Sequence, residues 1–514
     1  MMFRPLFLSL LGLAACGGDG ASFALTLHPY APIGQDPFGA SATVVLSIED
    51  AAGVAFTSIG ALGGDVRSGA DDHFGPLESA FVGIAAQDGG DDFDATRLLA
   101  FGDVGPYTLI DEQQDADVLV ASVAGIGGLD TLDADHAALR GAVAMMPDGS
   151  TWIFGGARAV TGNSGGGQAV VQSIPTLDAP SWVVDPVGDL PDFDENGAAD
   201  TRVGLTATVV TTPDGPRIFI AGGRPHTTAL DGSNKDAALY DPASHTWEWT
   251  TRSMVGTRSE HRAVALADGQ VLLVGGWAGD GVYTAATWEL FDPSTRSFRA
   301  APAPLPNGAL GFDIVPLATG GALLCGGGAY EGVGTASTAP QADCMLLSAS
   351  GSAAATSPLP VALQGLALAP LADGRVLACG GVTEVVEDGS FAVATDRAFV
   401  WDPGSEAWEE VGALDTPRTG HRALPLPDGD VVIVGGVQQG GLLSPVRSGP
   451  VRCDERFDAE TATFSAVEPC GAAGSGDLPA VAWDARHGAV VISGAGADGT
   501  GGADVGVVGF PPTF

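Results

Sequence analysis

The residues best suited to do chemistry stand in one acidic loop, which reads DFDENGAAD from residue 192 to residue 200. Calcium binds roughly six to eight oxygen atoms at about 2.4 Å, and side chains at alternate positions around a tight bend deliver such oxygens. Gly197, at the sixth position, permits the bend because glycine has no Cβ atom. The spacing therefore predicts a calcium site with side-chain ligands at positions one, three, five and nine: Asp192, Asp194, Asn196 and Asp200.

This spacing resembles the calcium loop of EF-hand proteins, but it departs from that loop at the twelfth position. Val203 stands there in place of a bidentate glutamate, and no helices are predicted on either side. A backbone oxygen, which we assign to Ala198, and water would complete the shell. The alternative is a solvated acidic turn in a chain that is acidic throughout. A second acidic loop contains Asp231, Asn234 and Asp236 but lacks the spacing of a calcium site.

Three histidines precede apolar runs, and two of them stand in nearly identical stretches. These are His136, His261 in TRSEHRAVALADG and His421 in PRTGHRALPLPDG. They could be ligands around a common axis. We favour the alternative that the repeated His-Arg pairs join neighbouring repeats by hydrogen bonds, because a residue that recurs with a repeat is explained by the repeat.

No GxSxG, HExxH or GxxxxGK[ST] motif appears, so the sequence identifies no catalytic residue.

The N-terminus, MMFRPLFLSLLGLAAC, is typical of a secretory signal. An apolar run too short to span a bilayer follows Arg4, and small residues precede Cys16. The last four residues resemble the bacterial lipobox, whose cysteine is lipidated and becomes the mature N-terminus. The resemblance implies a signal peptide over residues 1–15, a lipidated cysteine with a tether over residues 16–20, and an anchor in the outer membrane or at the cell surface. The alternative is an ordinary signal peptide with an unmodified cysteine.

Export permits disulfides, and hairpin register brings two pairs of cysteines together. Around the turn in DAETATF, Cys453 can reach Cys470 on the opposite strand. The same reasoning pairs Cys325 with Cys344. Cys379 is then left as a buried, small apolar residue.

The overall composition favours a turn-rich, all-β protein. The 514 residues allow two to four domains, 76 of the residues are glycine, and lysine occurs once. Acidic residues outnumber basic ones 62 to 22, which gives a formal net charge of −40. That charge repels nucleic-acid backbones and anionic headgroups, so we expect no nucleic-acid partner and membrane contact only through the lipid.

An internal repeat of about fifty residues dominates the chain after residue 115. An Asp-Gly hairpin turn precedes most of the double glycines, and a pair of aromatic residues flanks a second turn downstream, as in YDPASHTW. Each repeat is thus four strands, a sheet that needs neighbours stacked around an axis to bury both faces. The double glycines are Gly155/Gly156, Gly222/Gly223, Gly275/Gly276, Gly326/Gly327, Gly380/Gly381 and Gly435/Gly436, with a degenerate seventh at 494–496.

In this combination of features, the chain resembles the Kelch family of β-propellers over residues 116–514. The resemblance implies a seven-bladed propeller, in which the acidic loop would be a calcium site of the short propeller type. The last repeat lacks a fourth strand, whereas VLVASV (118–123) is a strand without a repeat. We therefore expect VLVASV to close the ring by completing the seventh blade. Residues 21–115 lack the double-glycine period and alternate apolar with polar residues, which predicts a small antiparallel β-sandwich of immunoglobulin-like type.

Two functions are compatible with these features. Copper enzymes similar to galactose oxidase use tyrosines, histidines and a domain after the propeller, and this pattern is not found, so we expect no copper radical site. The favoured function is a monomeric, non-catalytic surface lipoprotein whose propeller binds a protein or glycan. The alternative is an exported carbohydrate-active enzyme with its active site at the mouth of the propeller channel.

Overall fold

Strands make up every regular element described by the computed structural model of the chain. In the strands before residue 141 and after residue 479, the structure describes the backbone alone. Within the described residues, no helix is long and apolar enough to cross a membrane. The described residues are 11–12, 22–30, 43–50, 53–60, 77–87, 98–109, 113–122, 126–131, 141–156, 170–174, 185–192, 201–225, 233–278, 287–302, 305, 310–328, 339–384, 394–426, 429–439, 448–451, 454–467, 480–484, 489–495 and 503–509.

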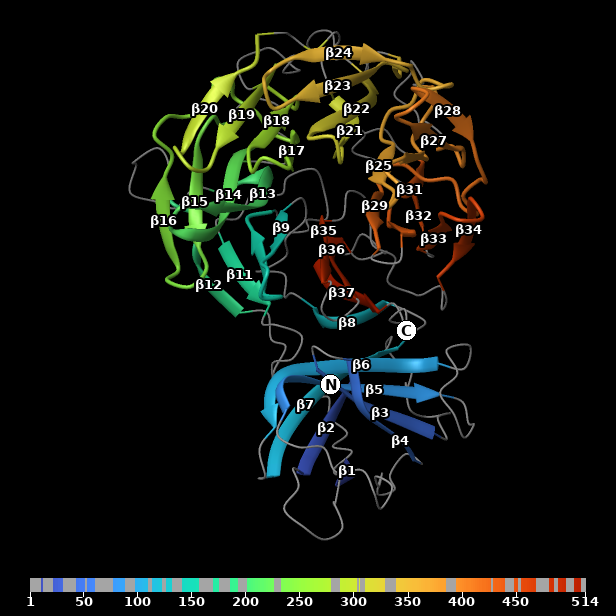
Figure 1. Cartoon of the computed structure of the whole chain (residues 1–514). Helices are drawn as coiled ribbons and strands as arrows, with labels where there is room; N and C mark the ends of the chain where they lie inside the picture. The colour runs from blue at the N-terminus through green and yellow to red at the C-terminus, as the bar shows by residue number, and fades with distance from the viewer. Residues whose placement is uncertain are drawn as a thin grey trace.

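Seven of the sheets have four antiparallel strands each, and their first strands are neighbours around a ring (Figure 1). We call these sheets blades 1 to 7 and count their strands outward from the axis. Blade 1 comprises β9 (Ala142–Met145), β10 (Thr151–Phe154), β11 (Val170–Ile174) and β12 (Asp185–Asp189). Blade 2 comprises β13 (Val203–Thr212), β14 (Gly215–Arg224), β15 (Ala237–Asp241) and β16 (Thr246–Trp249). Blade 3 comprises β17 (Arg262–Ala265), β18 (Val271–Val274), β19 (Trp288–Asp292) and β20 (Ser297–Ala300).

The next three blades repeat this order. Blade 4 comprises β21 (Leu310–Pro316), β22 (Gly321–Gly328), β23 (Cys344–Ser348) and β24 (Ala353–Thr356). Blade 5 comprises β25 (Ala367–Pro370), β26 (Val376–Cys379), β27 (Ala398–Asp402) and β28 (Ala407–Glu410). Blade 6 comprises β29 (Arg422–Pro425), β30 (Val431–Val434), β33 (Glu455–Asp458) and β34 (Thr463–Ala466), with a separate pair formed by β31 (Val437–Gln439) and β32 (Ser448–Pro450). The predicted all-β propeller is confirmed.

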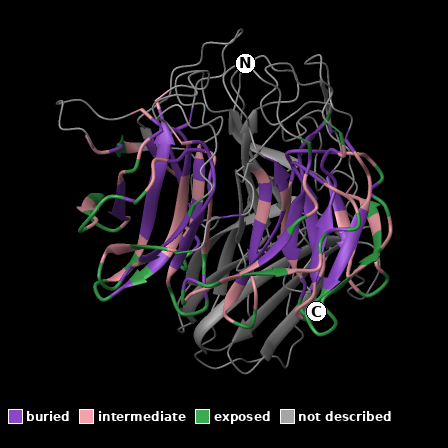
Figure 2. Ribbon diagram, turned by 90° about the horizontal axis from the view of Figure 1, so that it is seen from above, coloured by how far each residue is buried: buried purple, intermediate pink, exposed green. Residues whose placement is uncertain are grey.

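The Asp-Gly turns form as the sequence predicts. Gly149, Gly269 and Gly374 adopt positive φ angles of 85°, 85° and 90°, which residues with a Cβ atom avoid. The aspartate before each glycine fixes its own turn; for example, Oδ1 of Asp148 accepts a hydrogen bond from the amide of Ser150 at 2.9 Å. These turns lie at the exposed ends of the blades, whereas the buried positions lie along the strands (Figure 2).

The hydrophobic core lies between neighbouring blades rather than in one central mass. All four residues of β18 and all four of β30 are buried. Each described cluster of buried residues joins two successive blades, as where the rings of Phe219 in blade 2 and Phe291 in blade 3 stack with centroids 4.0 Å apart. Each blade therefore depends on its neighbours for the burial of its apolar side chains.

The strand that completes the last blade differs from the predicted one. Blade 7 comprises β35 (Ala480–Asp484), β36 (Ala489–Ala495), β37 (Ala503–Gly509) and, as its outermost strand, β8 (Ile126–Thr131). VLVASV lies instead almost wholly in β7 (Gln113–Ser122), which pairs in parallel with β2 (Ser22–Tyr30) over the full length of β2. The prediction that VLVASV closes the ring is therefore wrong, because its long apolar run finds a matching long strand in the N-terminal sheet.

The N-terminal region forms a single sheet of seven strands in its described residues, rather than the two sheets of the predicted sandwich. Its strand order is β1-β2-β7-β6-β5-β3-β4, and it lies beside blade 7 (Figure 1). The sheet extends to Ser122, past the predicted boundary at residue 115. Its remaining strands are β1 (Leu11–Gly12), β3 (Thr43–Asp50), β4 (Gly53–Gly60), β5 (Leu77–Gln87) and β6 (Leu98–Leu109).

The predicted disulfide between Cys325 and Cys344 is present. The two cysteines are direct partners in the register of β22 and β23, the second and third strands of blade 4. Cys379 is free and buried, as predicted, and burial raises the pKa of its thiol to about 12. Cys453 and Cys470 lie outside the described residues.

Candidate functional site

One backbone position at the start of the inner strand is left-handed in blades 2 to 6. Glycine occupies it in four of these blades, with φ angles of 66°, 69°, 73° and 69° at Gly204, Gly311, Gly365 and Gly420. In blade 3 the residue is Glu260, with a φ angle of 53°. A left-handed conformation costs a residue with a Cβ atom about 1–2 kcal/mol, and such strain clusters at functional sites. Glu260 is therefore the first candidate.

Backbone hydrogen bonds join this position from blade to blade. The amide of Glu260 donates to the carbonyl of Gly204 at 2.7 Å, and the amide of Gly365 donates to the carbonyl of Gly311 at 2.7 Å. The packing leaves little room for side chains, because a Cβ atom on Gly365 would lie 2.3 Å from Oγ1 of Thr419. The backbone conformation and the close packing therefore favour glycine at this position. The repeat does not explain why blade 3 has Glu260 instead.

The carboxylate of Glu260 reaches back to blade 2. Its Oε1 accepts a hydrogen bond from Nη2 of Arg224, the last residue of β14, at 3.1 Å. The Arg224 side chain is 2% exposed, and its Nη1 donates to Oγ of Ser259 at 3.0 Å. Because the Glu260 side chain is 15% exposed, its carboxylate is held by a buried partner yet still reached by solvent.

Two residues farther along, the side chain on the inner strand varies among the blades. Arg262 in blade 3 donates through Nε to Oδ1 of Asp313 in blade 4 at 3.1 Å. The other carboxylate oxygen of Asp313 accepts from the amide of Leu368 in blade 5 at 2.9 Å. Both charged side chains are partly exposed, at 24% for Arg262 and 14% for Asp313. One carboxylate therefore connects three successive blades.

Arg422 occupies the same position in blade 6 and is half-buried. Burial and then the positive charge of Arg262 lower the pKa of Arg422 to about 9, while Asp313 and Glu260 act in the opposite direction. Arg422 in blade 6 therefore lies within electrostatic range of side chains from blades 3 and 4. We call Arg224, Glu260, Arg262, Asp313 and Arg422 the axial cluster.

Buried arginines hold the segments that carry this cluster. Arg258 donates through Nη1 to the carbonyl of Gly275 at 3.1 Å and through Nη2 to Oε1 of Glu289 at 2.6 Å. In blade 6, Arg418 makes the equivalent contacts with the carbonyl of Gly435 and the carboxylate of Glu455. These contacts tie each connection between blades to the double glycine and third strand of the next blade. They therefore fix the backbone just before Glu260 and just before Arg422.

Two of the three histidines at the repeated position, His261 and His421, join blades, as the favoured interpretation predicts. Nε2 of His421 donates to the carbonyl of Cys379 in the preceding blade at 3.1 Å, and Nε2 of His261 lies 3.0 Å from Oγ1 of Thr206. Burial, followed by the charge of a nearby arginine, lowers the pKa of His421 to about 3 and that of His261 well below its ordinary value. Both rings are therefore neutral at pH 7 and structural. His136 lies outside the described residues.

Most of the predicted calcium site lies outside the described residues. Asp192 is described and half-buried, whereas Asp194, Asn196, Ala198 and Asp200 are not. Among the residues that the structure describes, no group of three or more histidine, cysteine, aspartate or glutamate side chains has a metal-binding arrangement. The calcium site stays a prediction.

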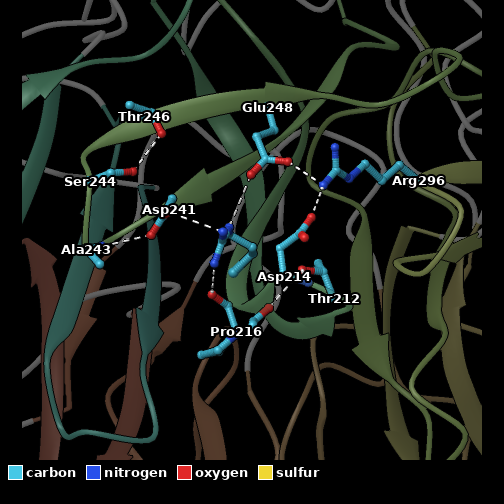
Figure 3. Close-up of polar contacts among 11 residues, drawn as sticks. Thr212, Asp214, Pro216, Asp241, Ala243, Ser244, Thr246, Glu248 and Arg296 are labelled. Atoms are coloured by element: carbon cyan, nitrogen blue, oxygen red, sulfur yellow. Dashed lines mark hydrogen bonds and ion pairs between the residues drawn. The ribbon is translucent and has the colours of Figure 1, made fainter.

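A second polar cluster lies at the hairpin-turn end of blades 2 and 3 (Figure 3). Glu248 pairs with Arg296 at 2.6 Å and with Arg217 at 3.4 Å. Arg296 also pairs with Asp214 at 2.8 Å, and Arg217 with Asp241 at 3.2 Å. These pairs join one turn of blade 3 to blade 2 near the surface, where an ion pair contributes about 0–1 kcal/mol. We interpret them as contacts between blades, not as a ligand site.

Sequence reasoning did not identify the axial cluster. Arg262 and Arg422 were visible only as parts of the repeated His-Arg pairs, and Glu260 not at all. One signal was nevertheless available, because TRSEHRAVALADG has glutamate where PRTGHRALPLPDG has glycine. A charged residue at a position where the other repeats have glycine breaks a structural rule of the repeat, and such breaks are expected at functional sites.

Comparison with known proteins finds the same architecture. No family model matches the chain. The chain is 28% identical to Kelch-like protein 35 of Mus musculus over 227 residues, which are 44% of this chain and 33% of that protein. It is 32% identical to N-acetylneuraminate epimerase of Brucella suis over 126 residues, which are 24% of this chain and 31% of that protein. The chain thus spans about a third of the length of these curated relatives.

A solved structure extends the similarity beyond these segments. A fungal alcohol oxidase of the AA5 family, in complex with copper, superposes with a TM-score of 0.56 at 14% sequence identity. The match covers 75% of this chain and 76% of that chain, and at this identity it concerns the fold alone. Taken with the ring of four-stranded antiparallel sheets, these similarities show that the chain has the fold of a Kelch-type β-propeller.

Proposed function

We propose that this chain is an exported, lipid-anchored recognition protein whose propeller binds a protein or glycan ligand at the end of the ring where the axial cluster lies. The observation that carries the proposal is the axial cluster itself. It contains charged side chains from blades 2, 3, 4 and 6, and those of Glu260, Arg262 and Asp313 are partly exposed. Buried arginines hold the supporting backbone rigidly, as a preorganised binding site requires.

The connectivity supports the choice of this end. The strand ends that are joined by the connections from one blade to the next, or by those between the second and third strands, lie at this end, where the inner strands begin. Such connecting segments tolerate variation in length and sequence, and rigid scaffolds commonly place binding residues on them. The opposite end carries the short Asp-Gly turns, whose residues satisfy their own hydrogen bonds.

The anchor and the calcium loop belong to the same proposal. Lipidation of Cys16 would hold the protein at the outer membrane, and labelling with a fatty-acid analogue should be lost in Cys16→Ala. Calcium bound by Asp192, Asp194, Asn196 and Asp200 would order the connection that enters blade 2. It should raise the melting temperature of the wild-type protein but not that of Asp194→Ala.

The test is a glycan array and a protein-capture array probed with purified full-length Cys16→Ala protein, with and without chelator. We expect defined ligands whose binding is lost when Arg262 or Arg422 is replaced by glutamine. Arg375→Gln is the matched control, because Arg375 lies in a hairpin turn at the opposite end and pairs with Asp373. Absence of any bound ligand, or binding that tolerates both cluster variants, would contradict the proposal.

A second candidate is an exported carbohydrate-active enzyme that uses the same cluster. The strained backbone of Glu260 favours it, because a carboxylate kept in a costly conformation beside an arginine suits proton transfer. The similarity to an N-acetylneuraminate epimerase suggests reducing acidic sugars as first substrates. Proton exchange and anomer ratios followed by NMR in deuterium oxide would detect turnover. Activity that persists in Glu260→Gln would argue against this candidate.

A further inference from the structure

The ring of His261 makes a single hydrogen bond within the described part of the chain, and its partner lies in the preceding blade. Nε2 of His261 is 3.0 Å from Oγ1 of Thr206, on the inner strand of blade 2. Nδ1 of His261 is buried and has no hydrogen-bond partner among the described residues. Either the ring donates to the hydroxyl group through Nε2, or the hydroxyl group donates to the ring. The direction decides what Thr206 can offer to a ligand.

The burial of Nδ1 determines this direction. The ring is neutral at pH 7, because burial lowers its pKa, and a neutral imidazole carries one hydrogen. If the hydroxyl group donated to Nε2, that hydrogen would be on Nδ1, as a buried donor without an acceptor among the described residues. Buried donors without a partner are rarer in proteins than buried acceptors without one. His261 therefore carries its hydrogen on Nε2 and donates it to Oγ1 of Thr206.

The equivalent histidine of blade 6 has the same arrangement, and there only one direction is possible. Nε2 of His421 lies 3.1 Å from the carbonyl oxygen of Cys379, which can only accept a hydrogen bond. Nδ1 of His421 is likewise buried without a partner in the part of the chain that the structure describes. Both histidines thus carry their hydrogen on Nε2, but only His261 donates it to a hydroxyl group.

The hydroxyl group of Thr206 is consequently left as a hydrogen-bond donor. Oγ1 accepts from His261, and no described residue accepts the hydrogen of the hydroxyl group itself. Thr206 is partly exposed and stands two residues after Gly204. A Cβ atom on Gly204 would lie 2.8 Å from Oε1 of Glu260, so the carboxylate of Glu260 lies against this part of the strand. Thr206 therefore offers its hydrogen close to a member of the axial cluster.

We propose that Thr206 is a specificity-determining residue of the axial binding site, where its hydroxyl group donates a hydrogen bond to a main-chain carbonyl oxygen of a peptide ligand. The inference rests on the proposed function, because it names the chemical group that the same site recognises. His261 acts as a positioning residue, because its hydrogen bond fixes the hydroxyl group as a donor. A donor that is fixed before binding loses little conformational freedom when the ligand binds.

The chemistry of the acceptor favours a peptide carbonyl group. A carbonyl oxygen can only accept hydrogen bonds, so it requires a donor such as Thr206. A sugar hydroxyl group can rotate to donate or to accept, so it depends less on a fixed donor. An anionic acceptor is disfavoured, because the carboxylate of Glu260 lies nearby and the formal net charge of the chain is −40.

The direction of the hydrogen bond between His261 and Thr206 can be tested without a ligand. Nitrogen-15 NMR distinguishes a ring nitrogen that carries a hydrogen from one that does not. Full-length Cys16→Ala protein is labelled at its histidines, and the signals of His261 are assigned by their loss in His261→Leu, since blade 5 has Leu366 at this position. We expect the hydrogen on Nε2 at pH 7. A hydrogen on Nδ1 would overturn the inference and leave the proposed function untouched.

A second experiment measures the hydrogen bond to the ligand. An array of immobilised dodecapeptides with acetylated and amidated ends is probed with the same full-length protein. We expect bound peptides whose affinity falls about tenfold in Thr206→Val, which keeps the shape of the side chain but lacks the hydroxyl group. Thr206→Ser keeps the hydroxyl group and should retain most of the affinity. Thr208→Val is the matched control, because Thr208 is also partly exposed and lies two residues farther along the same strand.

Replacement of peptide oxygens by sulfur then locates the acceptor. A thioamide is a weaker hydrogen-bond acceptor than an amide. In a bound peptide it should weaken binding at one peptide bond in particular, and that effect should disappear in the Thr206→Val protein. Thioamides that act equally on both proteins would show that Thr206 does not bind a main-chain carbonyl group.

The remaining outcomes separate the inference from the proposed function. Peptide binding that tolerates Thr206→Val, or binding of glycans alone on a parallel glycan array, overturns the inference but not the proposed function. A complete lack of ligands on both arrays removes both. If Thr206→Val does not fold, Thr206→Ala removes the same hydroxyl group and replaces it in both binding experiments.

Discussion

Glu260 and Arg224 hold blades 2 and 3 together at the axial end of the ring, with Oε1 of the glutamate 3.1 Å from Nη2 of the arginine. The glutamate does so from a left-handed backbone that four other blades assign to glycine. The residue with an energetically unfavourable backbone conformation is thus also one that supplies a negative charge to the axial cluster. Substitutions at residue 260 can measure separately the energetic cost of the left-handed backbone and the contribution of the carboxylate.

Replacing Glu260 by glycine should leave a more stable protein than replacing it by alanine. Both changes remove the ion pair with Arg224, but only glycine also relieves the left-handed strain, which is worth about 1 kcal/mol. Urea denaturation of the two variants measures the difference directly. Equal midpoints would show that the backbone at residue 260 is not strained.

Removal of a buried arginine should be far more costly than removal of an exposed one. Arg418 and Glu455 are fully buried, so Arg418→Met leaves a buried carboxylate without its main partner and should cost about 3–5 kcal/mol. Arg375→Met breaks an exposed pair in a hairpin turn and should cost less than about 1 kcal/mol. Chemical denaturation of both variants tests the contrast, and similar losses would contradict it.

The buried histidine of blade 6 should make the protein sensitive to acid. Burial lowers the pKa of His421 from its ordinary value of 6.5 to about 3, so below pH 6.5 the unfolded chain binds a proton that the folded chain excludes. Stability should therefore fall as the pH decreases from about 6.5 toward 3, by up to about 1.4 kcal/mol per pH unit for this residue. Asp454 opposes part of this loss, because burial raises its pKa to about 6 and the folded state then binds its proton more tightly.

His421→Leu isolates the contribution of the histidine. Blade 5 has Leu366 at the equivalent position, so leucine is compatible with the repeat. Denaturation midpoints measured at pH 7, 6 and 5 should fall less steeply in the variant than in the wild type. Parallel curves for the two proteins would show that His421 does not titrate on unfolding.

Ring closure should depend on β8 and not on β7. A protein that begins at residue 125 keeps β8, whereas one that begins at residue 132 lacks the partner of β37. Both lack VLVASV and the rest of the N-terminal sheet, so they differ only in the closing strand. The shorter protein should unfold with lower cooperativity, as followed by calorimetry. Identical transitions would mean that β8 does not close the ring.

The disulfide of blade 4 should stabilise the propeller measurably. It joins cysteines separated by 19 residues, and closing a loop of this size contributes about 3 kcal/mol in the chain-entropy description. The double variant Cys325→Ala/Cys344→Ala should therefore unfold at a lower urea concentration than the wild type without any reductant. A midpoint unchanged from the wild type would indicate that the bond does not form in the protein.

Local sequence patterns predict the strands of the blades. Features that depend on pairing between distant parts of the chain are harder to predict from the sequence. Double glycines, Asp-Gly turns and paired cysteines act within one hairpin, so the sequence alone locates the strands of blades 1 to 6 and the Cys325–Cys344 bond. The partner of VLVASV depends on competition between two distant strands, β2 and β37, which no local pattern resolves. The axial cluster is harder still to predict from the sequence, because Arg262, Asp313 and Arg422 belong to three different blades and approach one another only when the ring has formed.

The pairing of β8 with β37 also sets an order for biosynthesis. The ribosome makes β8 before any other strand of the propeller and β37 after all of them. Blade 7 therefore cannot be completed until the carboxyl-terminal residues have emerged, and until then the growing chain exposes strand edges that chaperones can recognise. A nascent chain released before residue 503 would lack the partner of β8 and would remain an open arc.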